Sequence, residues 1–256
     1  MFIADFHNDV LTSGKFTALP NFYFENEIVT AIFKGDRDLF TSLSLVKNAK
    51  YIAFEDVGYT DFNYEKITSL SPVYVGLCWN GENQFGYGCD YSFGLKSRGV
   101  ELVRRLSKDK IAVDTAHISK RGFIDIIDNA EKVVNSHTCL NGVFKHKRNL
   151  DDWQIKLLVE KGGLVGITCC GYFMTNVKHC KIDDFIENIL YFYERYGADN
   201  LCLGTDFYGT DFLPQGLDEN YQGFNLVAQK LSIKGMKNKD VEKVLYKNLS
   251  EFLSKR

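Results

Sequence analysis

Short apolar segments recur along this chain of 256 residues, and segments with the apolar spacing of helices lie between them. Each apolar segment is rich in β-branched or aromatic residues, which is typical of buried strands. Strands that alternate with helices form parallel sheets whose two faces are both covered. The eight segments expected to be strands are 2–6, 28–33, 51–54, 73–78, 111–115, 132–136, 163–168 and 201–205.

This alternation predicts the fold class, an α/β chain folded as a (β/α)₈ barrel with its active site at the C-terminal ends of the strands. A doubly wound open sheet is the alternative, but no Gly-x-Gly-x-x-Gly follows the first strand. No linker or internal repeat divides the sequence, so residues 1–256 are expected to form a single domain. The expected helices are 98–107, 118–129, 151–161, 183–196, 221–231 and 239–253.

The composition excludes several classes of protein. An apolar content of 45% is ordinary for a folded globular chain and excludes a disordered one. The net charge of −2, without a long run of either sign, excludes nucleic acid and anionic membranes as expected partners. No apolar run approaches the ~18 residues that span a bilayer, and no signal peptide is expected. The seven cysteines lack a Cys-x-x-Cys pair and are expected to be reduced thiols in the cytoplasm.

Polar residues of the metal-ligand type stand at the ends of five expected strands. In a barrel these ends converge on one mouth. Taken singly, each such residue is ordinarily structural or solvated, but several buried polar groups together are costly unless they are paired or bind a metal. The residues are His7 and Asp9 after the first strand, Glu55 after the third, His117 after the fifth, His137 after the sixth and Asp206 after the eighth.

These donors predict a metal-dependent hydrolase. Three imidazoles with two or three carboxylates suit two open catalytic metal sites that share a carboxylate, and they are too few for two closed structural zinc sites. Nitrogen and oxygen ligands without a thiolate favour zinc, with manganese, iron or cobalt as alternatives.

Short motifs around these strand ends form an ordered series that covers most of the chain. They are Asp-Phe-His-Asn-Asp (5–9), Phe-Glu (54–55), Gly-Leu-Cys-Trp-Asn (76–80), Gly-Val-Glu-Leu-Val-Arg-Arg-Leu (99–106), Val-Asp-Thr-Ala-His-Ile-Ser (113–119), Asn-Ser-His-Thr (135–138), Arg-Asn-Leu-Asp-Asp (148–152), Gly-Gly-Leu-Val-Gly (162–166) and Gly-Thr-Asp-Phe-Tyr-Gly (204–209). The series resembles the membrane dipeptidase family of zinc metallopeptidases, also called renal dipeptidases. The resemblance implies a (β/α)₈ barrel with a binuclear zinc site.

The resemblance also implies the metal ligands, residue by residue. One Zn²⁺ would be bound by His7, Asp9 and Glu55, and the second by Glu55, His117 and His137. Glu55 would therefore bridge the two ions of each chain and belong to the catalytic residues. A hydroxide that bridges the metals would attack the peptide carbonyl.

The substrate implied by the resemblance is a dipeptide, with a C-terminal D-residue accepted. Arg148 matches the family arginine that holds the terminal carboxylate, a task suited to its planar, bidentate guanidinium. Asp206 matches the aspartate that contacts the substrate amine and handles protons at the leaving nitrogen. Tyr172 falls near a tyrosine of the substrate pocket.

Two positions depart from the family pattern. Trp79 stands where well-known members carry a histidine that binds substrate, and an indole offers only a donor. Tyr208 stands where the pattern usually has aspartate. We expect Trp79 to change the substrate pocket while hydrolysis is retained. The alternatives are a related amidohydrolase that acts on N-acyl amino acids or lactams, and a ligand-binding homologue without catalysis, which the complete ligand set disfavours.

One further partner is expected from the segment 183–196. Its aromatic residues Tyr191, Phe192, Tyr193 and Tyr196 would divide between the core and an exposed patch. Because an exposed apolar patch marks a contact surface, these residues favour a homodimer.

Overall fold

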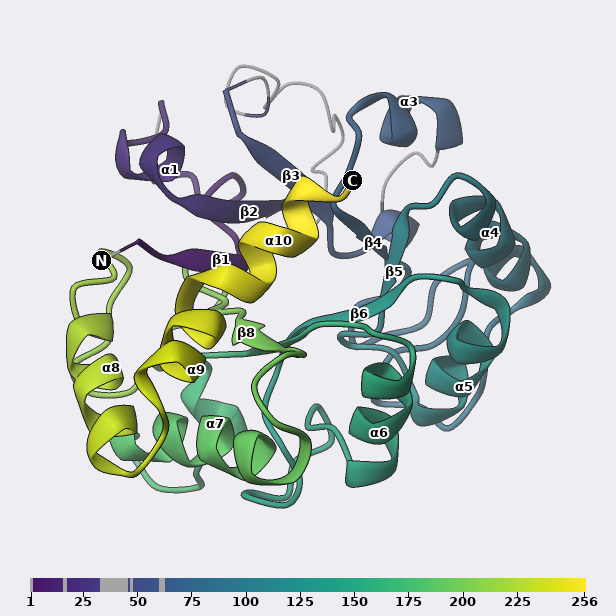
Figure 1. The fold of residues 1–256 in the computed structure, drawn as a ribbon. Helices are drawn as coiled ribbons and strands as arrows, with labels where there is room; N and C mark the ends of the chain where they lie inside the picture. Colours follow the sequence, from purple (N-terminus) through teal and green to yellow (C-terminus); the bar gives the residue numbers. More distant parts are fainter. Residues whose placement is uncertain (1, 16–17, 33–45, 47, 60–62) are drawn as a thin grey trace.

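The eight strands form one closed barrel in chain order, in a computed structural model that describes residues 2–15, 18–32, 46, 48–59 and 63–256. Every neighbouring pair is parallel, and the last strand pairs with the first (Figure 1). The expected (β/α)₈ fold is confirmed, and each expected segment overlaps a strand; residue 33 lies outside the described residues. The strands are β1 Ala4–Asn8, β2 Glu27–Ile32, β3 Tyr51–Phe54, β4 Tyr74–Gly76, β5 Ala112–Asp114, β6 Val133–Thr138, β7 Val165–Ile167 and β8 Leu201–Leu203.

Helices cover the outside of the barrel. They are α1 Phe22–Glu25, α3 Tyr64–Ser69, α4 Ser97–Lys108, α5 Lys120–Asn129, α6 Asp152–Glu160, α7 Ile182–Tyr196, α8 Phe224–Ile233, α9 Asn238–Glu242 and α10 Asn248–Ser254. The short helices α1 and α3 were not expected. The helix expected at 239–253 is divided, because a π-helical turn at Lys243–Lys247 separates α9 from α10.

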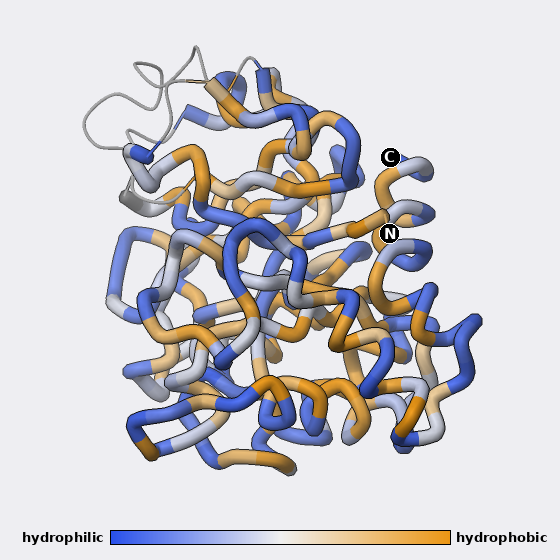
Figure 2. The backbone as a smooth tube through the Cα atoms, turned by 90° about the vertical axis from the view of Figure 1, so that its left-hand side faces the viewer, coloured by the Kyte–Doolittle hydropathy of each residue, from blue (hydrophilic) through white to orange (hydrophobic). Residues whose placement is uncertain are grey.

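Two apolar cores hold the barrel together. The larger one lies between the strands and the outer helices. The smaller one fills the barrel interior with side chains such as Phe6 and Tyr74, and Leu249 and Leu253 of α10 close it at the N-terminal end of the strands. Figure 2 shows the C-terminal segment with hydrophobic positions on its barrel side. Because side chains close the barrel at the N-terminal end of the strands, a site is expected at the C-terminal end.

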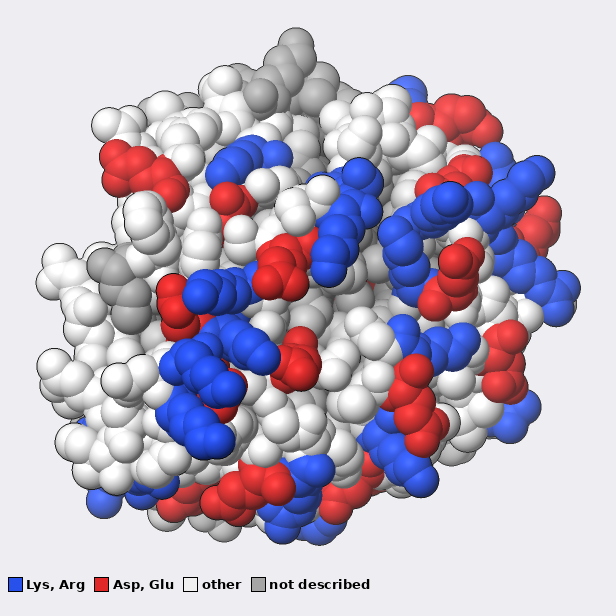
Figure 3. Space-filling view, viewed as in Figure 1, with Lys and Arg blue, Asp and Glu red and all other residues white. Residues whose placement is uncertain are grey.

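Charged side chains of both signs are mixed over the face that α10 crosses (Figure 3). Several of them form ion pairs, such as Lys50 with Glu27 at 3.0 Å and Lys243 with Asp199 at 2.5 Å. Among the helices within the described ranges, none is both long and apolar enough to cross a membrane.

The aromatic patch expected on α7 is not present in the expected form. Phe192 is buried, and three tyrosines are only partly exposed, with hydroxyl groups that donate hydrogen bonds inside the chain. The acceptors are an Asp152 carboxylate oxygen for Tyr191, Asp240 Oδ2 for Tyr193 and the Asp152 carbonyl for Tyr196. These tyrosines therefore join α7 to its neighbours, and the homodimer stays a prediction.

Candidate metal centre

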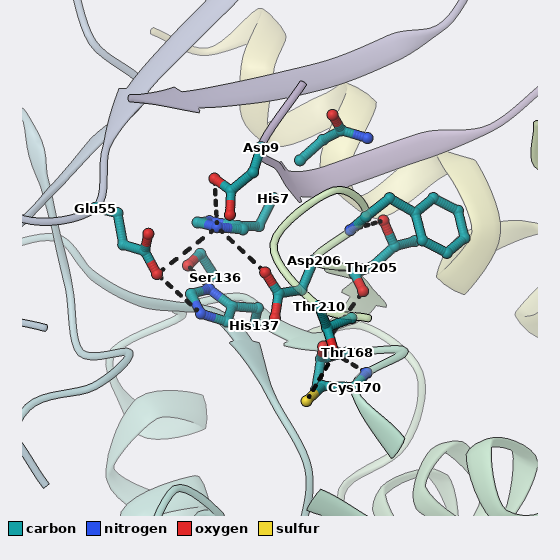
Figure 4. Close-up of polar contacts among 12 residues, drawn as sticks. His7, Asp9, Glu55, Ser136, His137, Thr168, Cys170, Thr205, Asp206 and Thr210 are labelled. Carbon is teal, nitrogen blue, oxygen red and sulfur yellow. Dashed lines mark hydrogen bonds and ion pairs between the residues drawn. The ribbon is translucent and has the colours of Figure 1, made fainter. Parts of the chain in front are cut away.

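The six expected donor side chains meet at the C-terminal mouth of the barrel. All six residues are buried. Figure 4 shows five of them pointing toward one another from the ends of different strands. His7 Nε2 lies 3.4 Å from Asp9 Oδ1 and 3.9 Å from Asp206 Oδ1. The closed barrel thus brings residues from the first and the last strand into one cluster.

Glu55 lies at the middle of this cluster. Its Oε1 atom is 2.9 Å from His117 Nε2, 3.5 Å from His137 Nε2 and 4.0 Å from His7 Nε2. A single carboxylate oxygen therefore faces all three imidazoles, which is the arrangement that a shared ligand requires.

The three histidines are oriented by hydrogen bonds at their other ring nitrogen, Nδ1. The partners are Tyr74 Oη at 2.6 Å from His7, Asn80 Oδ1 at 2.8 Å from His117 and Ser136 Oγ at 2.9 Å from His137. With Nδ1 engaged, each ring turns Nε2 toward the centre, as in metal sites whose outer ligands fix the ring. Sequence reasoning assigned no role to these three partners.

The local backbone departs from regular structure where it presents these side chains. The β1–β2 pairing shifts register between Asp5 and Asn8, around His7, and the β6–β7 pairing shifts between Asn135 and Thr138, around His137. Such irregularities re-aim side chains next to active sites. His117 and Asp206 have positive φ angles of 65° and 60°, an uncommon conformation that tends to mark functional positions.

Two carboxyl groups of the cluster have raised pKa values. Burial, followed by the nearby Asp9, raises the pKa of Glu55 well above its ordinary value and that of Asp206 to about 7. Burial alone would lower the pKa of His7, but the charges of Asp9, Glu55 and Asp206 outweigh it and raise that pKa to about 10. Ionising all of these carboxyl groups would therefore leave an excess of negative charge that a cation would relieve.

The other two imidazoles favour the neutral form. Burial lowers the pKa of His117 and of His137 well below the ordinary value, and the positive charges of Arg148 and His7 act in the same direction. Neutral imidazole is the form that binds metal ions.

The donor atoms fit a metal centre. His7 Nε2 and Asp9 Oδ1 are buried and make no hydrogen bond. His117 Nε2 and His137 Nε2 lie 2.8 Å apart, and two nitrogen lone pairs at that distance repel unless a cation or a proton lies between them. Two overlapping groups hold their ligand atoms within 4.8 Å of one another, namely His7 with Glu55 and His137, and His7 with Asp9 and Asp206. Nitrogen and oxygen donors without a thiolate suit zinc.

Arg148 lies beside the cluster and is 5% exposed. Its Nη2 donates to the His137 carbonyl at 3.4 Å, while its Nε is buried without a hydrogen-bond acceptor. The guanidinium also faces the Phe173 ring at 5.3 Å and lines a cavity of about 460 Å³ between α5 and α6. A buried guanidinium with unused donor capacity is suited to an anionic group of a ligand.

The remaining two expected residues differ in position. The Trp79 ring lies 5.7 Å from the His117 ring, so Trp79 forms a wall next to the centre. Tyr172 is 53% exposed, its hydroxyl donates to Asp211 Oδ1 at 3.0 Å, and its ring packs on Phe212. Within the described residues, no contact joins Tyr172 to the cluster, and its role in the pocket stays a prediction.

Two of the known proteins similar to this chain are described as dipeptidases. The chain is 28% identical over 163 residues to "Dipeptidase tcpJ" of Claviceps purpurea (strain 20.1), covering 62% of this chain and 38% of that protein. It is 25% identical over 190 residues to "Uncharacterized dipeptidase C965.12" of Schizosaccharomyces pombe, covering 71% and 46%. The chain thus spans less than half the length of these two relatives.

Solved structures share the fold over nearly the whole chain. A metallopeptidase from Rhodobacter sphaeroides, liganded with a phosphinate mimic of the dipeptide L-Ala-D-Ala, superposes with a TM-score of 0.86 at 17% identity and covers 99% of both chains. Dipeptidase AC, a metallopeptidase of family M19, superposes with a TM-score of 0.83 at 18% identity, covering 99% of this chain and 98% of that one.

The sequence profile described as "Membrane dipeptidase (Peptidase family M19)" matches residues 64–255. This span includes His117, His137 and Asp206, whereas His7 and Glu55 precede it and rest on the barrel geometry. Because the match covers most of the sequence, the chain belongs to the membrane dipeptidase family, peptidase family M19.

Proposed function

We propose that this chain is a zinc-dependent dipeptidase with two metal ions. His7, Asp9 and Glu55 would hold one ion, and Glu55, His117 and His137 the other. The observation that carries the proposal is the convergence of three Nε2 atoms on Glu55 Oε1, at 2.9 to 4.0 Å. When bound, two zinc ions would lower the pKa of a water that serves as nucleophile and would polarise the peptide carbonyl.

The chain's own residues would bind the substrate and move the proton. Arg148 would pair with the C-terminal carboxylate of the dipeptide, since its buried Nε has no partner in the described part of the chain. Asp206, whose pKa burial raises to about 7, would protonate the departing amine.

The substrate class and the compartment follow from separate observations. The dipeptide mimic in the similar Rhodobacter structure supports a dipeptide, including one with a C-terminal D-residue. All seven cysteines are free thiols, which supports a reducing compartment, the cytoplasm.

The test combines metal content with a substrate panel. We expect two zinc ions per chain and hydrolysis of L-L, L-D or D-D dipeptides, assayed beside N-acyl amino acids and a β-lactam. His117→Ala should abolish hydrolysis, whereas His179→Ala, which changes an exposed histidine, should not. Fewer than two metal ions per chain, or unchanged activity in His117→Ala, would contradict the two-metal proposal.

A second candidate is a related amidohydrolase that acts on N-acyl amino acids or lactams. The observation that favours it is the Trp79 ring, 5.7 Å from His117, which replaces a polar group with an apolar wall. Hydrolysis of acylated substrates alone would support this candidate. An unchanged substrate range in Trp79→His would remove its basis.

A further inference from the structure

Asp114 is a buried carboxylate at the end of β5, for which neither the ligand set nor the substrate contacts give a role. It is 1% exposed. Its Oδ1 accepts hydrogen bonds from the backbone N–H groups of Ala116 at 3.0 Å and Ser136 at 2.9 Å. Its Oδ2 accepts the Ser136 hydroxyl at 2.5 Å. All of these contacts are made by donors, which suits an acceptor-only carboxylate.

The Ser136 hydroxyl connects Asp114 to the metal centre. Ser136 Oγ also lies 2.9 Å from His137 Nδ1 (Figure 4). A hydroxyl has one hydrogen, and here that hydrogen is donated to Asp114, so Oγ can only accept from the ring. His137 must therefore carry its proton on Nδ1, which leaves a lone pair on Nε2, the atom 3.5 Å from Glu55 Oε1.

We propose that Asp114 is a positioning residue that, through Ser136, fixes His137 in the tautomer able to bind a metal ion. The effect on metal binding rests on the proposed function, whereas the hydrogen bonds between Asp114, Ser136 and His137 do not. Carboxylates that act on a ligating histidine commonly contact the ring directly. In this chain a serine hydroxyl is interposed.

A matched arrangement on the opposite side of the barrel lacks the imidazole. Asp5 accepts the Thr205 backbone N–H at 2.8 Å and the Thr205 hydroxyl at 2.6 Å, and Thr205 precedes Asp206 as Ser136 precedes His137. Among the described residues, no histidine nitrogen is hydrogen-bonded to the Thr205 hydroxyl. Asp5→Asn therefore removes an equally buried carboxylate without reaching a ring tautomer.

The substitution Asp114→Asn would reverse the hydrogen-bond direction. The amide Nδ2 replaces Oδ2 and donates to Ser136 Oγ, so the serine hydrogen turns toward His137 Nδ1. The ring proton then moves to Nε2, and that nitrogen can no longer bind a metal. We expect the affinity for one of the two zinc ions to fall about 10- to 100-fold, the usual cost of losing an outer partner of a ligand.

The experiment measures zinc affinity by competition with a chromophoric chelator for the full chain and for three variants. Ser136→Ala should reduce the affinity for one zinc ion less than Asp114→Asn does. Without the hydroxyl, the His137 ring is free to adopt either tautomer, whereas in Asp114→Asn it is held in the reversed one. The double variant should resemble Ser136→Ala, since the reversal needs the hydroxyl. Losses that simply add, or an unchanged affinity in Asp114→Asn, would overturn the proposal.

Nitrogen-15 NMR of the histidine rings supplies a readout that does not depend on activity. His137 should carry its proton on Nδ1 in the wild-type chain and in Asp5→Asn, and on Nε2 in Asp114→Asn. A proton on Nε2 in the wild-type chain would overturn the inference. If the wild-type chain binds no zinc, the proposed function fails, and the ring tautomer in the metal-free chain still decides the role of Asp114.

Discussion

Gly209, in the loop after β8, tests how closely the metal centre is packed. A Cβ atom at this position would lie 2.2 Å from Asp206 Oδ1 and 2.2 Å from Asp9 Oδ2, whereas ordinary contact begins at 3.4 Å. Its φ is not in the left-handed region, so an alanine backbone fits there. In Gly209→Ala, both carboxylates would therefore have to retreat by about 1 Å.

The size of the effect follows from this displacement. A misplacement of about 1 Å in a catalytic site costs roughly 100-fold in rate. We therefore expect kcat/KM for a dipeptide to fall about 100-fold in Gly209→Ala, or about 2.7 kcal/mol of transition-state stabilisation. Zinc affinity should fall as well, because Asp9 is an expected ligand.

The assay compares steady-state hydrolysis and zinc affinity with those of a matched variant. In Gly94→Ala, the added Cβ would lie 2.2 Å from Asp125 Oδ2, a carboxylate on α5 outside the metal centre. Gly94→Ala shows what displacing a carboxylate outside the metal centre does to the protein. Its zinc affinity should match that of the wild-type chain. Wild-type kcat/KM in Gly209→Ala, or equal loss of zinc in both variants, would refute the reasoning.

Three further predictions concern protons, substrate and stability. The His7 pKa of about 10 lies above its ordinary 6.5, so the ring proton stabilises the metal-free fold below pH 6.5, and this contribution is lost as pH rises toward 10. Zinc must displace that proton, so zinc affinity should rise about tenfold per pH unit near neutrality; a flat profile in chelator competition would contradict this. Arg148→Lys should raise KM about tenfold with little change in kcat, because lysine cannot bind a carboxylate bidentately; a purely kcat effect in steady-state kinetics would be inconsistent with substrate binding. Tyr221→Phe removes a hydroxyl that donates to Asp5 Oδ2 at 2.5 Å and accepts from Asn8 Nδ2 at 2.8 Å, and should lower the free energy of unfolding by about 1–3 kcal/mol; an unchanged urea midpoint would count against it.

The fold was predictable because burial on both faces makes each barrel strand apolar along its length. The segment 51–54 coincides with β3, and the others differ from their strands by a few residues at the ends. Two strands continue two residues beyond the expected segments although these residues are polar, β1 through His7 to Asn8 and β6 through His137 to Thr138. In these two strands the hydrophobic pattern ends where the site begins, so the sequence predicts an early end, whereas β4, β5, β7 and β8 end one or two residues before their expected segments do.

Convergence of the donor residues was predictable for the same reason, since strand ends in a barrel share one mouth. The residues that orient them were not. Tyr74 lies near the start of β4, and only the barrel interior brings its hydroxyl to His7, 67 positions away in the sequence. Tyr172 is exposed and hydrogen-bonded to Asp211, because proximity to a strand end does not determine which way a side chain in a following turn points, and its role in the pocket stays a prediction.

Closure of the barrel has a consequence for how the chain is made. The contact of Asp5 with Thr205 joins residues 200 positions apart in the sequence, and Asp206 reaches His7 across the same seam between β1 and β8. During synthesis from the N-terminus, β1 must therefore keep one edge unpaired until nearly the whole barrel has emerged. Asp206, the last of the six donor residues, joins the cluster only when β8 has arrived, so the cluster is incomplete until then. Truncated or stalled chains would then expose both an open sheet edge and an incomplete donor cluster, and these are the species that chaperones would need to hold.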